Sequence, residues 1–133
     1  RGRASQVHGC PEEGARRGGL KIVDLSGDSV LRARQIARDM PHLSIHDGFA
    51  FALAQSYPGC ILLTGDGGLR ALAKEQYMEV HGVLWAIDEL HRHAICTAET
   101  LLHALQLLAH DPTVRLPQRE LAESIKRYAE KCR

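Results

Sequence analysis

The sequence predicts an α/β protein in which helices flank a parallel sheet, and two observations support this fold class. First, short runs of apolar and β-branched residues alternate along the chain with longer segments whose apolar residues recur at helical spacing. Alternation of this kind is typical of a parallel sheet with helices packed on it. Second, residues 60–64 form a continuous apolar run of strand length. Such a run suits a parallel strand that is buried on both faces.

Length and composition agree with one domain that has a real core. The chain has 133 residues, of which 44% are hydrophobic and 25% are charged, and this balance is usual for a globular protein. Its formal net charge is +1, so a role with nucleic acid would depend on a local site and not on a strongly basic surface. No apolar run is long enough to span a bilayer, and we expect no membrane partner.

The four cysteines and eight histidines do not predict a metal site. The cysteines are scattered without a C-x-x-C pair, which argues against a zinc ribbon and is compatible with reduced thiols in the cytoplasm, the compartment that we expect. His91 and His93 do not share a helical face, and His103 and His110 share one without an acidic or cysteine partner. We therefore interpret these histidines as surface or packing residues.

The chain divides into three predicted regions. Residues 1–19 are rich in Gly, Arg and small polar residues, and we expect them to be a flexible lead-in. Residues 20–95 are expected to form the α/β core. Residues 96–133 are expected to add helices at the C-terminus, where Thr97 can cap one helix and Pro117 suits the first turn of the last one.

The core is predicted to begin with a strand at residues 20–25, a short β-branched run. Asp28 or Ser29 can cap the helix that follows, and Pro41 ends it. Ser44 opens a second helix, which ends before Pro58 and Gly59. The remaining elements of the core are expected in this order: a strand at residues 60–64, a turn at 65–68, a helix at 69–76, a minor strand at 79–82 and a helix at 83–90.

Two aspartates at helix starts are the candidate functional residues. Ser44 and Asp47 have capping-box spacing, and Asp66 in its Gly-rich turn could simply cap the next helix. However, Asp66 directly follows an apolar strand, and ligand sites in open α/β sheets lie beyond the carboxyl ends of the strands. Carboxylates there suit a hard cation. Arg70, one turn later, could meet a phosphate or could be a solvated surface arginine.

In their order along the chain, these motifs resemble those of PIN domains, and most closely the VapC-like group of small bacterial and archaeal proteins. The resemblance covers roughly Leu20 to Ile95, and its ordered combination is fairly specific although either piece alone is weak. The matching residues are Leu43, Ser44, Asp47, Leu53 and Ala54, then Leu62, Leu63, Thr64, Gly65, Asp66, Leu69, Arg70, Leu72 and Ala73, then Val80 and Gly82.

The resemblance implies an endoribonuclease that depends on Mg²⁺ or Mn²⁺, often the toxin of a toxin–antitoxin pair. Of the family's cluster of about four acidic residues, two match Asp47 and Asp66, which would hold metal and act in catalysis. Ser44, Thr64 and Arg70 would contact the substrate, and Arg70 would do so at a phosphate. The implied partners are an RNA substrate, an antitoxin protein and a second copy of the chain.

The sequence departs from the family's pattern at its start, and we expect a PIN-like fold that is truncated at the N-terminus. No strand ending in aspartate precedes residue 20, and Glu12 and Glu13 lie too close to it to replace the family's early glutamate. Asp24 and Asp28 could approach the site, although caps and strand ends commonly hold aspartate. We expect the strands at 20–25 and 60–64 to pair directly, unless another chain lies between them.

Other functions remain open at this point. With two of the four carboxylates, two-metal chemistry is hard to build, so the chain is either a nuclease whose site is completed elsewhere or a catalytically inactive PIN-like module that binds a protein partner. The C-terminal helices either form an interaction surface or cover the sheet. An unrelated α/β enzyme acting on a small molecule would lack the usual phosphate loop, nucleophile elbow and dinucleotide fingerprint.

Overall fold

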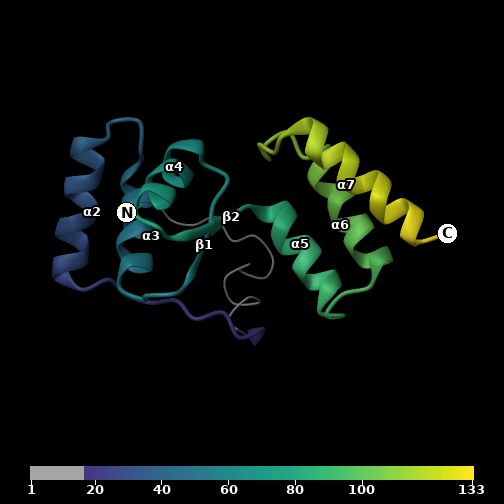
Figure 1. Cartoon of the computed structure of the whole chain (residues 1–133), viewed down its shortest axis with the longest axis horizontal. Coiled ribbons are helices and arrows are strands. Elements are labelled where there is room, and N and C mark those ends of the chain that lie inside the picture. Colours follow the sequence, from purple (N-terminus) through teal and green to yellow (C-terminus); the bar gives the residue numbers. More distant parts are fainter. Residues whose placement is uncertain (1–16) are drawn as a thin grey trace, which may run out of the picture.

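The computed structural model describes residues 17–133, so residues 1–16 of the predicted lead-in lie outside the described part of the chain. In chain order the described elements are α2 (Gly27–Asp39), α3 (Ile45–Gln55), β1 (Ile61–Leu63), α4 (Gly67–Glu75), β2 (Glu79–His81), α5 (Val83–Arg92), α6 (Ala98–His110) and α7 (Gln118–Lys131). They form two lobes that lie side by side in Figure 1. The first lobe runs from α2 to β2, and the helical lobe runs from α5 to α7.

Each lobe has a core of its own. Helices α2, α3 and α4 and both strands contribute to the first core, in which Phe51 is fully buried. Ile87 of α5, which the sequence places in the 20–95 region, packs with α6 and α7 in the second core. The fully buried Leu105 and Tyr128 belong to this second core. Gly82, between β2 and α5, connects the lobes.

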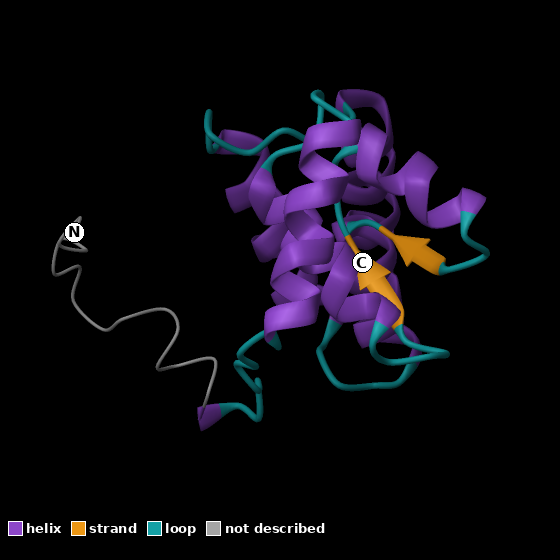
Figure 2. Ribbon diagram, turned by 90° about the vertical axis from the view of Figure 1, so that its left-hand side faces the viewer, coloured by secondary structure: helices purple, strands orange, loops and turns teal. Residues whose placement is uncertain are grey.

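A two-stranded parallel sheet confirms the α/β class. In its register Ile61 pairs with Glu79, Leu62 with Val80 and Leu63 with His81. The two short strands appear among the helices in Figure 2. The minor strand predicted at 79–82 is therefore present, and most of the described chain is helical. None of the helices within residues 17–133 combines the length and the apolarity needed to cross a bilayer.

Two predictions about the sheet are wrong. Residues 20–25 form no strand and do not pair with β1; Leu20 and Ile22 are 55% and 46% exposed. β1 is not buried on both faces, because Leu62 is buried while Ile61 and Leu63 are 43% and 55% exposed. Both errors have one physical cause: β-propensity and apolar character produce a buried strand only when neighbouring strands and helices cover it.

The helix starts agree closely with the sequence. Ser44 and Thr97 cap α3 and α6 as predicted, each accepting a hydrogen bond from the backbone N–H three residues on. α2 starts slightly earlier than predicted, with Ser26 and not Asp28 or Ser29 as its cap. Pro117 stands at the N-cap of α7, one position before its first helical residue. Local hydrogen bonds of this kind depend on few residues, which explains why they can be predicted.

Helices α2 and α3 approach closely enough to require a glycine. A Cβ on Gly48 would lie 2.6 Å from the carbonyl oxygen of Ala33. Ala33 is itself fully buried. The contact fixes α3, whose first turn carries Asp47, against α2.

Candidate functional site

The capping box of α3 holds Asp47 in place. Its Oδ2 accepts a hydrogen bond of 2.9 Å from the backbone N–H of Ser44, and its own N–H donates to Ser44 Oγ at 3.1 Å. The structural interpretation of the Ser44–Asp47 spacing is therefore confirmed. These bonds occupy one carboxylate oxygen of Asp47, and no hydrogen bond to its Oδ1 is present within residues 17–133.

Asp66 is the N-cap of α4, the position that Ser44 has in α3. Its Oδ1 accepts a hydrogen bond of 2.8 Å from the backbone N–H of Leu69, and its N–H donates to Thr64 Oγ1 at 3.1 Å. Thr64 in turn extends the sheet, because its N–H donates to the carbonyl of His81 at 2.9 Å. The exposed Asp66 side chain thus lies just beyond the carboxyl end of β1.

The two helix starts that carry these aspartates are neighbours. A Cβ on Gly68, in the first turn of α4, would lie 2.6 Å from Cδ2 of His42 and 3.1 Å from Cδ2 of Leu43. The residues immediately before α3 therefore pack against the first turn of α4. Both N-termini also favour negative charge, since the helix dipole is positive there. Ser44, Asp47, Thr64 and Asp66 belong to one edge of the first lobe, which we call the acidic edge.

The donors of the acidic edge suit a divalent cation but form an incomplete set. Carboxylate oxygens are the ligands that Mg²⁺ and Mn²⁺ prefer, and Asp47 and Asp66 each have one oxygen left after capping. No group of three His, Cys, Asp or Glu side chains that could hold a metal exists among residues 17–133. Other oxygens, from water or from a phosphate, would have to fill the remaining coordination positions.

Asp24 and Asp28 do not contribute to this edge. Asp24 lines a hollow together with residues at and beyond the end of α3. Arg32 of α2 donates to Gln55 Oε1, the last residue of α3, at 3.4 Å, so the start of α2 with Asp28 also lies at that end. Asp47 lies eight residues before Gln55 in α3, which is about 12 Å along the helix axis. Of the two alternatives left open for Asp24 and Asp28, the structure therefore favours a position away from the site.

Arg70 extends from α4 toward the helical lobe. A Cβ on Gly82 would lie 3.6 Å from its Nη1, which places the guanidinium beside the connection between the lobes. It is half-buried, and no ion pair or hydrogen bond occupies it within the described residues. It lines a groove of about 450 Å³ between the lobes, which we call the interlobe groove. The other lining residues that matter here are Gly65, His81, Trp85, Arg115, Glu120, Glu123 and Arg127.

An aromatic pair forms part of the wall of this groove. The rings of His81 and Trp85 are stacked, with centroids 4.0 Å apart and planes 6° apart. His81 Nε2 also lies 3.0 Å from Glu79 Oε1. Trp85 and Arg115 could not be singled out from the sequence, because no motif or spacing relates residues that only the packing of the two lobes brings together.

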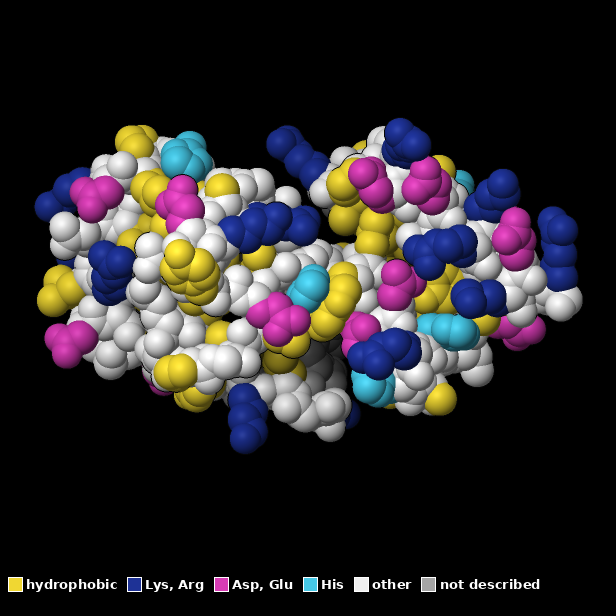
Figure 3. Space-filling view, in the orientation of Figure 1, with side chains coloured by type: hydrophobic (Ala, Val, Ile, Leu, Met, Phe, Trp, Pro, Cys, Tyr) yellow, Lys and Arg dark blue, Asp and Glu magenta, His cyan; other side chains and the backbone are white. Residues whose placement is uncertain are grey.

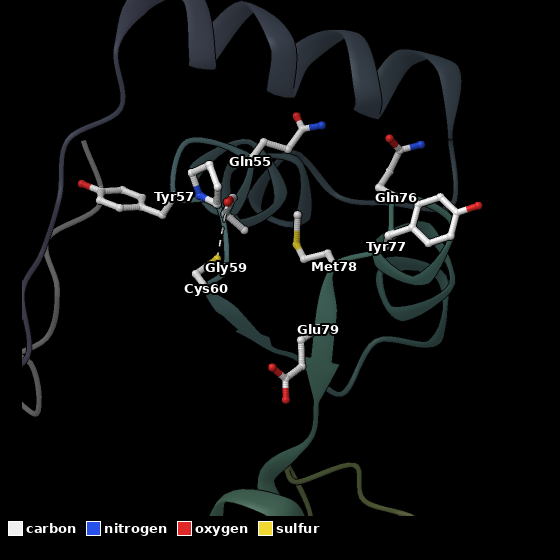
Figure 4. A pocket seen from close by; sticks show the side chains of 10 residues that line it. Gln55, Tyr57, Gly59, Cys60, Gln76, Tyr77, Met78 and Glu79 are labelled. Carbon is white, nitrogen blue, oxygen red and sulfur yellow. Dashed lines mark hydrogen bonds between the residues drawn. The ribbon is translucent and has the colours of Figure 1, made fainter.

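A second hollow, of about 420 Å³, lies at the opposite end of the sheet (Figure 4). Tyr57 and Cys60 line it from the α3–β1 connection, and Met78 and Glu79 line it at the start of β2. The Cys60 thiol donates to the carbonyl of Ala54 at 3.4 Å, so this cysteine has a structural contact. Because this hollow lies at the amino ends of the strands, it is separate from the acidic edge.

Comparisons with family models, with curated proteins and with solved structures give no match to this chain.

Proposed function

We propose that the protein is a metal-dependent endoribonuclease of PIN type, with Mg²⁺ or Mn²⁺ as its cofactor and RNA as its substrate. The observation that supports this proposal is the acidic edge: Asp66 follows the carboxyl end of a parallel strand, and the adjoining helix start carries Asp47. Ligand sites of open α/β sheets occupy this position. The order of motifs that resembles PIN domains adds to this support.

The chain's own groups would bind and orient the reactants. The free oxygens of Asp47 and Asp66 would hold the cation, and their hydrogen bonds to backbone N–H groups fix the orientation of both carboxylates. Thr64 would keep the turn before Asp66 in place through its hydroxyl oxygen. When bound, the cation would activate a water and stabilise charge on the attacked phosphodiester. Ser44 would position Asp47, and Arg70 would meet a substrate phosphate.

A second candidate is a catalytically inactive PIN-like module that binds a protein partner, for example within a toxin–antitoxin complex. Two observations favour it. The described residues assemble fewer than three possible metal ligands at any point, and one face of the sheet exposes Ile61 and Leu63. Exposed apolar side chains on an edge strand are a common feature of surfaces that pair with another chain.

A ribonuclease assay separates the two candidates. We expect the chain to cleave single-stranded RNA with Mn²⁺ and not with EDTA. We expect the double variant Asp47→Asn, Asp66→Asn to lose this cleavage by at least about 100-fold, because the cation that would activate the attacking water loses both carboxylate ligands. Asparagine can still cap a helix, so the double variant should fold.

The matched control is Asp24→Asn, which removes a carboxylate at the opposite end of α3 and should cleave like the unaltered chain. Cleavage that persists equally in the double variant would contradict the nuclease proposal. Absence of metal-dependent cleavage in the unaltered chain would favour the protein-binding module.

A further inference from the structure

The interlobe groove joins the acidic edge directly. Gly65 lines the groove, and the next residue along the chain is Asp66. Figure 3 shows a hollow between the lobes with dark blue basic side chains at its rim. We propose that the groove binds single-stranded RNA next to the cleavage site, with a phosphate between Arg70 and Arg115 and a base against Trp85. This proposal rests on the proposed function and names where that function holds its substrate.

Two unsatisfied cations from different lobes supply the site for a phosphate. Arg70 projects from α4, and Arg115 belongs to the connection between α6 and α7. Neither forms an ion pair or a hydrogen bond within residues 17–133. Arg127, by contrast, has partners: its Nη1 lies 3.5 Å from Asp88 Oδ1, and its Nη2 donates to Ser124 Oγ at 3.1 Å. Free guanidinium groups favour phosphate, whose oxygens match their planar donors.

The acidic side chains of the groove argue against a free phosphate ion as its ligand. Glu120 and Glu123 line the wall that α7 provides. Glu123 already accepts a hydrogen bond from Arg119 Nε at 3.1 Å, whereas Glu120 has no partner within the described residues. A carboxylate repels an inorganic anion but accepts hydrogen bonds from base N–H groups and from ribose hydroxyls. The mixed lining therefore suits a nucleotide better than a bare anion.

Trp85 supplies a surface on which a base can stack. Its ring lines the groove and is stacked on His81, which supports its orientation. Proteins that bind single strands combine such aromatic surfaces with basic groups that follow the backbone. The volume of about 450 Å³ lies in the range of sites for nucleotide-sized ligands. The formal net charge of the whole chain is only +1, which is compatible with binding confined to a local site such as this groove.

The single tryptophan of the chain makes the test specific. In EDTA, which prevents cleavage, we expect an oligouridylate to quench Trp85 fluorescence saturably, with an affinity that falls as salt rises. The double variant Arg70→Gln, Arg115→Gln should bind at least about tenfold more weakly. Arg34→Gln is the matched control, because Arg34 is exposed on α2 in the first lobe, and it should bind like the unaltered chain.

The outcomes also separate this proposal from the proposed function. The double variant Asp47→Asn, Asp66→Asn should keep the fluorescence response while losing cleavage. A fluorescence response without any cleavage by the unaltered chain would contradict the nuclease proposal and support the groove proposal. Cleavage with no Trp85 response, or equal affinities for the groove variant and Arg34→Gln, would overturn the groove proposal. Uridine monophosphate or inorganic phosphate competing as tightly as the oligonucleotide would overturn it too, because the ligand would then not be a strand.

Discussion

The two lobes complete their cores in different ways. The helical lobe closes its core with its own three helices, and even the buried hydroxyl of Tyr128 has a partner there, Asp88 Oδ1 at 2.8 Å. The first lobe covers one face of its sheet and leaves Ile61 and Leu63 exposed on the other. The candidate chemistry belongs to this less enclosed lobe. The comparison shows that the helical lobe encloses its core with its own helices, whereas the first lobe leaves one face of its sheet exposed and carries the acidic edge.

The largest expected effect on stability comes from truncating one fully buried side chain in each core, in separate variants. Phe51→Ala in the first lobe should cost about 3–5 kcal/mol and Leu105→Ala in the helical lobe about 2–5 kcal/mol, as measured by urea unfolding. Because the two cores are separate, hydrogen exchange should rise in α3, β1 and α4 for Phe51→Ala, and in α5, α6 and α7 for Leu105→Ala. Equal loss of protection in both lobes would contradict the separation.

A smaller effect is expected where α2 and α3 touch. Gly48→Ala places a methyl group 2.6 Å from the carbonyl oxygen of Ala33, and forced overpacking of this kind costs about 1–3 kcal/mol. Gly27→Ala is the matched control, since no atom lies within 4 Å of its added Cβ. Calorimetry should show a lower melting temperature for the first variant only. Similar melting temperatures would show that α2 moves away without cost.

In the helical lobe, the ionisation of Tyr128 should lower the free energy of unfolding at alkaline pH. Burial, and then the hydrogen bond to Asp88, raise the pKa of Tyr128 from 10.0 to about 12. A folded-state pKa above the unfolded value means that the stabilisation is complete below about pH 10 and is lost as the pH rises toward 12. Tyr128→Phe should cost about 1 kcal/mol at neutral pH and should remove this part of the alkaline loss. Unfolding free energies measured across this pH range check both expectations.

The smallest effect distinguishes capping from catalysis at Asp66. Asp66→Ala should cost about 1 kcal/mol, because the N–H of Leu69 loses its acceptor. Asp66→Asn should cost only a few tenths of a kcal/mol, since asparagine also caps helices. Thermal melts of both variants test this order. If Asp66→Asn unfolded as readily as Asp66→Ala, loss of cleavage in the asparagine variant could not be assigned to a lost metal ligand.

Features of this fold that depend on local hydrogen bonds could be predicted from the sequence, whereas features that depend on a neighbouring strand could not. Helix starts such as Ser44 and Thr97 follow from hydrogen bonds that span three residues, and the minor strand predicted at 79–82 is present as the parallel strand Glu79–His81. The strand expected at 20–25 is absent because its propensity has no partner strand to act on within residues 17–133.

The candidate site shows the same difference between local features and features that depend on tertiary packing. Asp47 and Asp66 could be singled out because each stands at a predictable helix start. The groove could not, because Arg70 and Arg115 are far apart in the sequence and only the arrangement of the two lobes places them on one groove.

The central claim is that Asp47 and Asp66 hold one cation together. The direct measurement is paramagnetic broadening of backbone amide signals by Mn²⁺ in NMR spectra. We expect the amides of residues 44–48 and 64–68 to lose intensity together at the same Mn²⁺ concentration, and we expect Asp47→Asn, Asp66→Asn to abolish the effect while Asp24→Asn keeps it. Broadening at only one of the two segments, or identical broadening in the double variant, would contradict the account.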